Sequence, residues 1–360
     1  MITLTSDKGI YRFGPEDLIG VGGCASLFLS RFKAFGEHQA EKKVALKVAK
    51  RKTLHTQYEG EIHRLLSGEL ENSPSCHPNI VKLLDVFNTE GISKTQETQE
   101  HIVTEYCKGG DLNKFITKNA VLCEAECIYI LKQLLCGLYH IHNFGSPNII
   151  HRDIKPKNLL VKDDLIKIAD FGFACYTPSF SSSSPFLYGS DLFLAPEIRH
   201  SQHAVYTRAS DIYALGVTLS QLAYGRSITA KLMRYACSGR LSLPVNKCVS
   251  DGMMILVKMM ASVNDRATMH HIMHSSIFDM SDTLLDNTSR SSMKLSPHKH
   301  KQMIESMFRE LRSSFVCKLI VVVDVYSVEV MAGHDEESGY MEFELNIPVE
   351  PYFESVMFIV

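Results

Sequence analysis

One octapeptide and one tripeptide limit what this chain can fold into more than any other feature. The octapeptide is His151-Arg152-Asp153-Ile154-Lys155-Pro156-Lys157-Asn158, and the tripeptide Asp170-Phe171-Gly172 begins twelve residues after Asn158. Either fragment alone could be a chance loop sequence. Both together, in this order and at this spacing, are highly specific, so we interpret them as parts of one functional constellation.

The two fragments resemble the catalytic loop and the metal-binding motif of eukaryotic protein kinases, and the resemblance covers roughly residues 13 to 278. It implies an α+β, bilobal protein kinase fold with a β-rich N-lobe and an α-rich C-lobe. The combination of Lys155, Pro156 and Asn158 is similar to the loop of serine/threonine kinases and differs from that of tyrosine kinases.

The chemistry of phosphoryl transfer explains why these residue types are needed. The reaction asks the protein mainly for positioning and for neutralisation of phosphate charge. By the resemblance, Asp153 is the catalytic base for the acceptor hydroxyl, and Lys155 contacts the γ-phosphate. Mg²⁺ prefers oxygen ligands, and Asn158 and Asp170 hold the family's metal-binding positions. The resemblance therefore implies ATP and Mg²⁺ as cofactors.

A glycine cluster near the N-terminus is expected to hold the nucleotide. Small residues let backbone N–H groups approach phosphates, although a lone glycine cluster is more often a turn. Lys47, 25 residues after Gly22, resembles the family lysine that pairs with the α- and β-phosphates. Ala25 replaces the third glycine of the family pattern. The expected loop residues are Ile19, Gly20, Val21, Gly22, Gly23, Cys24, Ala25, Ser26 and Leu27.

Lys47 needs a carboxylate partner from the helix expected at about residues 54–66. Glu59 and Glu61 are both candidates, and periodicity alone does not choose between them. Both glutamates lie on the flanks of this helix when its apolar side chains face inward, namely Tyr58, Ile62, Leu65 and Leu66. The family context Glu-Ile-x-x-Leu matches the stretch that starts at Glu61, so we expect Glu61 to pair with Lys47 and Glu59 to be solvated.

The segment Val103-Thr104-Glu105-Tyr106-Cys107 resembles the hinge that binds adenine through its backbone. In this interpretation Thr104 is the gatekeeper, and Glu105 and Cys107 belong to the hinge. Three further side chains are expected to enclose the adenine ring from above and below: Ala45, Leu27 and Leu160.

The second half supplies the expected substrate platform. Ala195-Pro196-Glu197 resembles the end of the activation segment, with Arg266 as the expected partner of Glu197. Asp211 matches the helix aspartate that braces the catalytic loop. Within the family, the chain is most similar to the autophagy-initiating serine/threonine kinases, through Tyr106 to Leu112, Lys167 to Ala174, and Gly189-Ser190.

The chain is expected to be organised as a protein kinase domain at 10–278, a linker at 279–301 and an extension at 302–360. The N-lobe (about 10–105) should form a five-stranded antiparallel sheet with one main helix, and the C-lobe (about 110–278) should be mostly helical. Helices are expected at 127–142 and 212–222 from their apolar spacing. The extension should contain a small helix followed by strands, with 315–330 as strand material.

Charge and hydropathy restrict the partners. Lys plus Arg is 38 and Asp plus Glu is 40, so the net charge is 38 − 40 = −2. This balance gives no support for nucleic-acid binding, which usually needs a basic surface. We expect a cytoplasmic chain without a transmembrane segment. Its expected partners are ATP and protein substrates, with a regulatory partner or a membrane surface considered for the extension.

Two function classes remain open at this stage. The first is an active serine/threonine kinase, and the alternative is a nucleotide-binding pseudokinase or scaffold. The first is favoured because the four family positions on which transfer depends are all filled by the expected residue types: Lys47, Asp153, Asn158 and Asp170.

Overall fold

The computed structural model describes most of the chain, in two compact units, Met1–Glu305 and Ser306–Val360. The described residues are 1–23, 25–36, 40–50, 58–67, 76–89, 98–116, 122–144, 148–177, 183–184, 189–199, 201, 204–228, 249–263, 265–279, 300–325, 330–334, 341–345 and 358–359.

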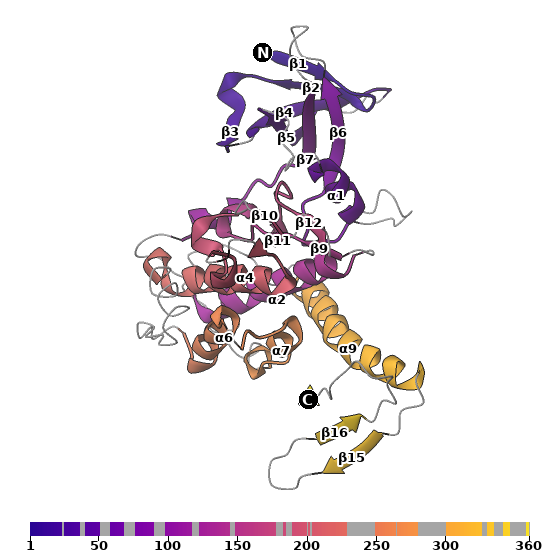
Figure 1. Ribbon diagram of the computed structural model, residues 1–360. Coiled ribbons are helices and arrows are strands. Elements are labelled where there is room, and N and C mark those ends of the chain that lie inside the picture. Colours follow the sequence, from indigo (N-terminus) through magenta and orange to yellow (C-terminus); the bar gives the residue numbers. More distant parts are fainter. Residues whose placement is uncertain are drawn as a thin grey trace. The chain divides into compact units, whose positions relative to one another are not determined.

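An antiparallel sheet builds the N-terminal part of the first unit (Figure 1). Over the described residues the sheet has seven strands in the order β1-β2-β4-β5-β7-β6, with β3 paired to β4. The strands are β1 Ile2–Thr5, β2 Gly9–Phe13, β3 Leu18–Val21, β4 Ala25–Ala34, β5 Lys42–Ala49, β6 Leu83–Thr89 and β7 Gln99–Glu105.

The expectation of five strands is wrong, because β1 and β2 form a hairpin in front of the glycine cluster. Burial alternates along β2, and Tyr11 and Phe13 enter the core beside Val44, Leu46 and Val103. Two buried aromatic side chains on one strand face give β2 an apolar surface that must be covered, and the sheet covers it.

The sheet curls until its two ends meet. The hydroxyls of Tyr11 and Ser6 donate hydrogen bonds to Oδ2 of Asp85 on β6, at 2.7 and 2.6 Å. Lys8 Nζ donates to the carbonyl oxygen of Leu84 at 2.6 Å. These contacts join the β1–β2 hairpin to β6, although the sequence separates them by more than seventy residues.

Among the described residues of the N-terminal part, one α-helix packs on this sheet. It is α1, Glu59–Leu66, and residues 51–57 of the longer helix expected from the sequence lie outside the described part. A Cβ atom at Gly60 would lie 3.0 Å from Val86 on β6, so the glycine permits the close approach of helix and strand.

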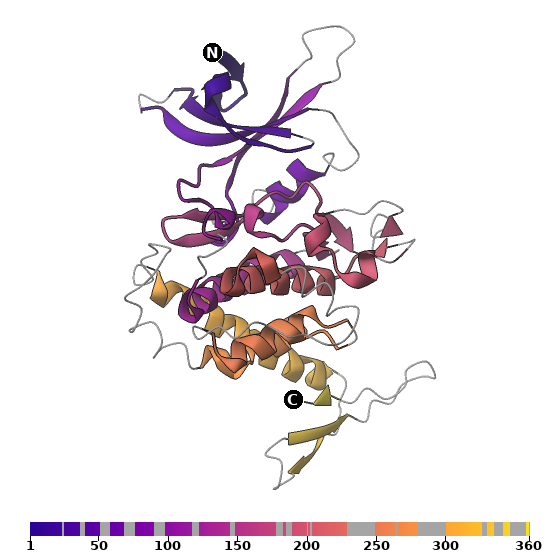
Figure 2. The ribbon, with the colours of Figure 1, turned by 90° about the vertical axis from the view of Figure 1, so that its left-hand side faces the viewer.

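The C-terminal part of the first unit is mostly helical. The helices expected at 127–142 and 212–222 are confirmed as α2 and α4, both largely buried. Figure 2 shows the helices together on the side away from the N-terminal sheet. The helices are α2 Glu124–Asn143, α3 Pro196–Arg199, α4 Arg208–Tyr224, α6 Asp251–Ala261 and α7 Met269–Met273.

Short strands that flank the catalytic loop lie between the sheet and these helices, among them β9, β10, β11 and β12 (Figure 1). β10 pairs with β11 and with β8, β9 pairs with β12, and β13 pairs with β14. The strands are β8 Gly110–Asp111, β9 Asn148–Ile150, β10 Leu159–Lys162, β11 Leu165–Ile168, β12 Cys175–Thr177, β13 Ser183–Ser184 and β14 Ala204–Val205.

The helix α9, Lys301–Val325, begins in the first unit and continues into the second. The strand expected at 315–330 is therefore wrong as far as Val325. Extending an existing helix needs no new nucleus, so the preceding amphipathic turns favour helix over strand. The strands β15 Val330–His334, β16 Met341–Leu345 and β17 Phe358–Ile359 follow. Most of the expected linker, 280–299, lies outside the described residues.

Among the described helices, none combines the length and the hydropathy that a bilayer span requires.

Candidate active site

Lys47 on β5 is held between two carboxylates. Its Nζ lies 2.6 Å from Oε1 of Glu59 on α1 and 2.7 Å from Oδ1 of Asp170. Burial alone would lower the pKa of Lys47, but the two carboxylates outweigh it and raise that pKa. Burial also opposes ionisation of Asp170, yet the charge and hydrogen bond of Lys47 lower its pKa to about 2. Lys47 and Asp170 therefore stay charged at neutral pH and connect the sheet to the C-lobe.

The expectation that Glu61 pairs with Lys47 is wrong, because Glu59 is the partner. Glu61 is exposed, and its Oε1 accepts a hydrogen bond from the Tyr176 hydroxyl on β12 at 3.1 Å. The expectation that Glu59 is solvated is wrong as well, since only 3% of Glu59 is accessible.

The inward face of α1 explains this result. Its buried side chains follow the spacing i, i+3, i+4 and i+7, which defines one face of a helix. They are Glu59, Ile62, His63 and Leu66. Tyr58, which the sequence interpretation turned inward, is 48% exposed. The face is therefore rotated, and Glu59 reaches Lys47 from its N-terminal end.

The catalytic loop surrounds Asp153 with donors. Oδ2 of this buried carboxylate accepts hydrogen bonds from Lys155 Nζ at 2.6 Å and from Asn158 Nδ2 at 2.9 Å. Oδ1 accepts one from the Ser190 hydroxyl at 3.2 Å, and Lys155 also donates to Ser190 Oγ at 2.7 Å. The sequence interpretation noted Ser190 only as part of a motif, whereas the structure brings it to the carboxylate of the expected base.

Asn158 connects this loop to the Asp170 motif. Its side-chain nitrogen also donates to the Asp153 backbone oxygen at 2.9 Å, and its own backbone oxygen accepts from Ala169 N at 2.9 Å. Because the amide nitrogen is engaged in the loop, the amide oxygen is the Asn158 atom with the chemistry of a metal ligand. The two expected Mg²⁺ ligands, Asn158 and Asp170, thus lie on hydrogen-bonded segments.

Asp211 braces the catalytic loop, as expected from the sequence. Its buried carboxylate accepts hydrogen bonds from the backbone N–H groups of His151 and Arg152, both at 2.9 Å, and from His142 Nε2 at 2.8 Å. Burial opposes ionisation, but His142 and the other donors outweigh it and lower the pKa of Asp211. Arg152 has a φ of 65°, and Asp170 has a φ of 66°. Such conformations are costly for non-glycine residues and persist where neighbouring contacts impose them.

The predicted pair of Glu197 and Arg266 is confirmed. The guanidinium makes a bidentate contact with the carboxylate, at 2.5 and 2.9 Å. Arg266 also donates to the backbone oxygens of Ser262 and Ala209. The buried guanidinium thereby fixes α3, at the end of the activation segment, to the start of α4.

The glycine cluster lies in the hairpin between β3 and β4. Gly22 N donates to the Ala25 backbone oxygen at 2.9 Å, and Lys50 Nζ donates to the Gly22 backbone oxygen at 2.8 Å. In the ladder of β4 and β5, Leu27 is opposite Lys47. Cys24 lies outside the described residues. The hairpin therefore joins the expected phosphate-binding backbone to the strand that carries Lys47.

The expected hinge follows β7. Thr104 is opposite Ala45 in the ladder with β5, and Cys107 packs in a small buried cluster that Leu160 adjoins. The carboxylate of Glu105 is engaged by Lys162 at 2.5 Å and by Lys167 at 2.8 Å. Burial opposes ionisation of Glu105, but the lysines lower its pKa. The side chain of Glu105 therefore ties the hinge to β10 and β11.

Phe171 contacts two histidine rings that the sequence interpretation did not connect. It is fully buried, and its ring centroid lies 4.8 Å from that of His63 on α1 and 5.2 Å from that of His151. His63 Nε2 lies 2.8 Å from the Val81 backbone oxygen. Burial lowers the pKa of His63 to about 4, so the ring is neutral at pH 7. These rings connect α1 to the catalytic loop through the core.

The fold and this arrangement define the class of protein. The family model described as the protein kinase domain matches residues 13–278, and the chain belongs to the protein kinase family. Members of this family use ATP, typically with Mg²⁺, to phosphorylate proteins.

Three similar proteins are serine/threonine kinases of one type. The serine/threonine-protein kinase atg1 of Dictyostelium discoideum is 37% identical over 177 residues, 47% of this chain and 25% of that protein. The serine/threonine-protein kinase ATG1c of Arabidopsis thaliana is 34% identical over 223 residues, 61% of this chain and 27% of that protein. The serine/threonine-protein kinase ULK1 of Homo sapiens is 32% identical over 234 residues, which are 62% of this chain and 20% of that protein.

These matches confirm the resemblance to Atg1-type and ULK-type kinases that the motifs indicated. The chain matches about a quarter of the length of these relatives.

Proposed function

We propose that this chain is an active serine/threonine protein kinase that transfers the γ-phosphate of ATP to hydroxyl groups of protein substrates. The observation that carries the proposal is the completeness of two linked clusters. Lys47, Glu59 and Asp170 form one cluster, with contacts of 2.6 and 2.7 Å. Asp153 and Lys155 lie at the centre of the other.

The residues present fit Mg²⁺ and ATP. Asp170 offers an ionised carboxylate and Asn158 an amide oxygen, and both are oxygen ligands of the kind that Mg²⁺ prefers. The metal, when bound, neutralises phosphate charge. Lys47 would hold the α- and β-phosphates, and the backbone of the β3–β4 hairpin would cover them. The adenine would be held at the hinge by Glu105, Cys107, Thr104, Ala45, Leu27 and Leu160.

Asp153 would orient the acceptor hydroxyl and take its proton. Three donors fix the carboxylate, from Lys155, Asn158 and Ser190, so its direction is set before a substrate arrives. The ammonium group of Lys155 would contact the γ-phosphate and stabilise its negative charge during transfer. The proton leaves the acceptor oxygen as the new oxygen–phosphorus bond forms, and the bond to the leaving β-phosphate oxygen breaks.

A radiolabelled-ATP assay on an arrayed peptide library, with Mg²⁺ present, tests this proposal. The wild-type chain should label Ser and Thr peptides, and Asp153→Ala should label none. Lys47→Met should also abolish transfer while thermal melting stays close to that of the wild type, because Lys47 positions phosphate.

Two results would contradict the proposal. Nucleotide binding without transfer by the wild-type protein would favour the alternative, a pseudokinase or scaffold. Labelling confined to tyrosine peptides would show that the class of acceptor is wrong.

The relatives also support a broader proposal, that the chain acts in autophagy initiation or related signalling. The observation behind it is the similarity to the Atg1-named kinases of Dictyostelium discoideum and Arabidopsis thaliana, at 37% and 34% identity. The test is complementation in cells that lack this kinase. Autophagic turnover should return with the wild-type chain and not with Asp153→Ala, and full turnover without the kinase would contradict the role.

A further inference from the structure

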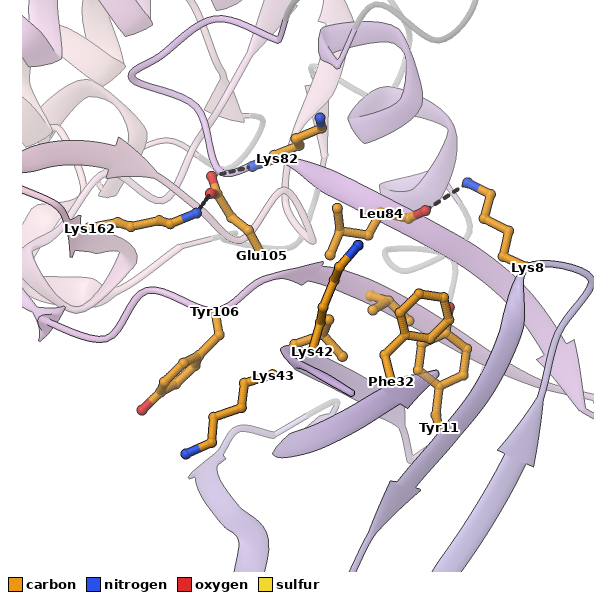
Figure 3. A pocket seen from close by; sticks show the side chains of 12 residues that line it. Lys8, Tyr11, Phe32, Lys42, Lys43, Lys82, Leu84, Glu105, Tyr106 and Lys162 are labelled. Carbon is orange, nitrogen blue, oxygen red and sulfur yellow. Dashed lines mark hydrogen bonds and ion pairs between the residues drawn. The ribbon is translucent and has the colours of Figure 1, made fainter. Parts of the chain in front are cut away.

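A recess lies on the N-lobe, on the face of the sheet beside the hinge (Figure 3). Its volume is about 530 Å³, and strands β2, β4, β5, β6 and β7 contribute to its walls. Lys47, Glu59, Asp153 and Asp170, which form the catalytic clusters, do not line it. The recess therefore needs an explanation separate from phosphoryl transfer.

Its floor is apolar and aromatic. The ring of Phe32, which is partly buried, stacks on that of Tyr11 with centroids 4.8 Å apart, and Tyr11, Val44 and Val103 are at most 2% exposed beneath it. Leu84 on β6 is only partly buried at the same place. A floor of this kind favours an apolar side chain over a small inorganic ion.

Its rim is strongly basic. Five lysines line the recess: Lys8, Lys42, Lys43, Lys82 and Lys162. Glu105 is the one carboxylate among the lining residues, and Lys162 and Lys167 already engage it at 2.5 and 2.8 Å. Lys8 Nζ lies 3.9 Å from Oδ1 of Asp85, so the exposed Lys43 and Lys82 carry the rim charge that an anionic partner would meet. In a chain whose net charge is −2, this is a local concentration of positive charge. It would attract an anionic partner and repel a cationic one.

We propose that this recess binds an acidic segment of a protein partner. One apolar side chain of the segment would lie on the partly buried Phe32 ring and Leu84, and neighbouring carboxylates would meet the lysine rim. The floor explains why a purely ionic ligand is not favoured. The concave shape of the recess suits a side chain more than a flat lipid surface. Lysine ammonium groups are compact point charges on flexible stems, which suits carboxylates whose spacing varies.

The probe is a fluorescein-labelled peptide of sequence EDFEED, titrated with the full chain and followed by fluorescence polarisation. Lys43→Glu combined with Lys82→Glu reverses two rim charges, and both residues are exposed. Lys33→Glu combined with Lys258→Glu is the matched control, because it makes the same change in net charge at two residues that do not line the recess. Thermal melting of both double variants checks that they fold.

The rim variant should weaken the dissociation constant by about tenfold or more, and the control variant by less than about twofold. Peptide EDGEED, which lacks the apolar anchor, should bind more weakly than EDFEED. Affinity should fall as salt rises from about 0.05 M to about 0.5 M, because screening weakens the ionic contacts.

Three results would overturn the proposal. One is the absence of saturable binding at low salt, and another is equal loss in both folded double variants. The third is equal binding of EDFEED and EDGEED together with competition by inositol hexakisphosphate, which would identify a site for ions and not for an acidic segment. None of these readouts depends on phosphoryl transfer, so the proposed kinase activity can fail or hold independently.

Discussion

The two neighbouring glutamates of α1 offer a matched test of the active-site geometry. Glu59→Gln removes a buried charge 2.6 Å from Lys47 Nζ, whereas Glu61→Gln changes an exposed group that contacts Tyr176. Without Glu59, Lys47 keeps only Asp170 as a partner, so its ammonium group is less firmly positioned for phosphate. A misplacement of about 1 Å in a positioning group can cost about 100-fold in rate. We therefore expect kcat/KM to fall by roughly 30- to 150-fold.

The assay is steady-state transfer to one optimised Ser peptide, with kcat and the KM for ATP measured separately. Glu59→Gln should lower kcat/KM by the stated factor, while Glu61→Gln should stay within about threefold of wild type. Both substitutions preserve side-chain volume, so melting temperatures report any loss of folding. If Glu61→Gln were the more damaging of the two, the assignment of Glu59 as the partner of Lys47 would be refuted.

Four further outcomes are expected. Asp153→Asn should lower kcat by about 10²–10⁴-fold with little change in the KM for ATP, measured in the same peptide assay. Asp170→Asn should raise the Mg²⁺ concentration for half-maximal activity about tenfold or more, read from a metal titration, because one ligand loses its charge. Glu305→Ala should destabilise the fold by about 2–4 kcal/mol in urea unfolding, because the nearly buried Lys132 loses a carboxylate at 2.8 Å. Because burial lowers the pKa of His63 to about 4, the unfolded chain binds an extra proton as pH falls below about 6.5. Stability should therefore drop by about 2 kcal/mol between about pH 7 and about pH 5 from this residue, and His63→Leu should flatten that urea-unfolding profile.

The sequence was sufficient to predict which side chains meet where they lie a short, fixed distance apart along the chain. Asp153, Lys155 and Asn158 lie within one loop, and their local order already determines which of them can meet. The pairs of Glu197 with Arg266 and of Asp211 with the catalytic loop were also predicted correctly, because the family motifs mark both partners.

The sequence was not sufficient to predict the carboxylate partner of Lys47, because that partner depends on how the short helix α1 is rotated about its axis. The inward face was assigned to apolar residues alone, so it left out Glu59 and His63, which with Ile62 and Leu66 form the buried face of α1. A buried neutral histidine looks polar in a helical wheel, although it packs as an aromatic ring. The β1–β2 hairpin was missed for a related reason, since the polar hydroxyl of Tyr11 is satisfied by Asp85, far along the chain.

The error over Glu61 also reveals how α1 is positioned. Glu59 connects the helix through Lys47 to Asp170, and Glu61 connects it through a 3.1 Å hydrogen bond to Tyr176 on β12. The two acidic side chains are therefore linked to residues that follow the catalytic loop, Glu59 through Lys47 and Glu61 directly. A rotation of α1 that brought Glu61 to Lys47 would carry Glu59 out of its buried position and break the Tyr176 contact at the same time. The observed orientation satisfies both glutamates at once, which is the physical reason that the helix adopts it.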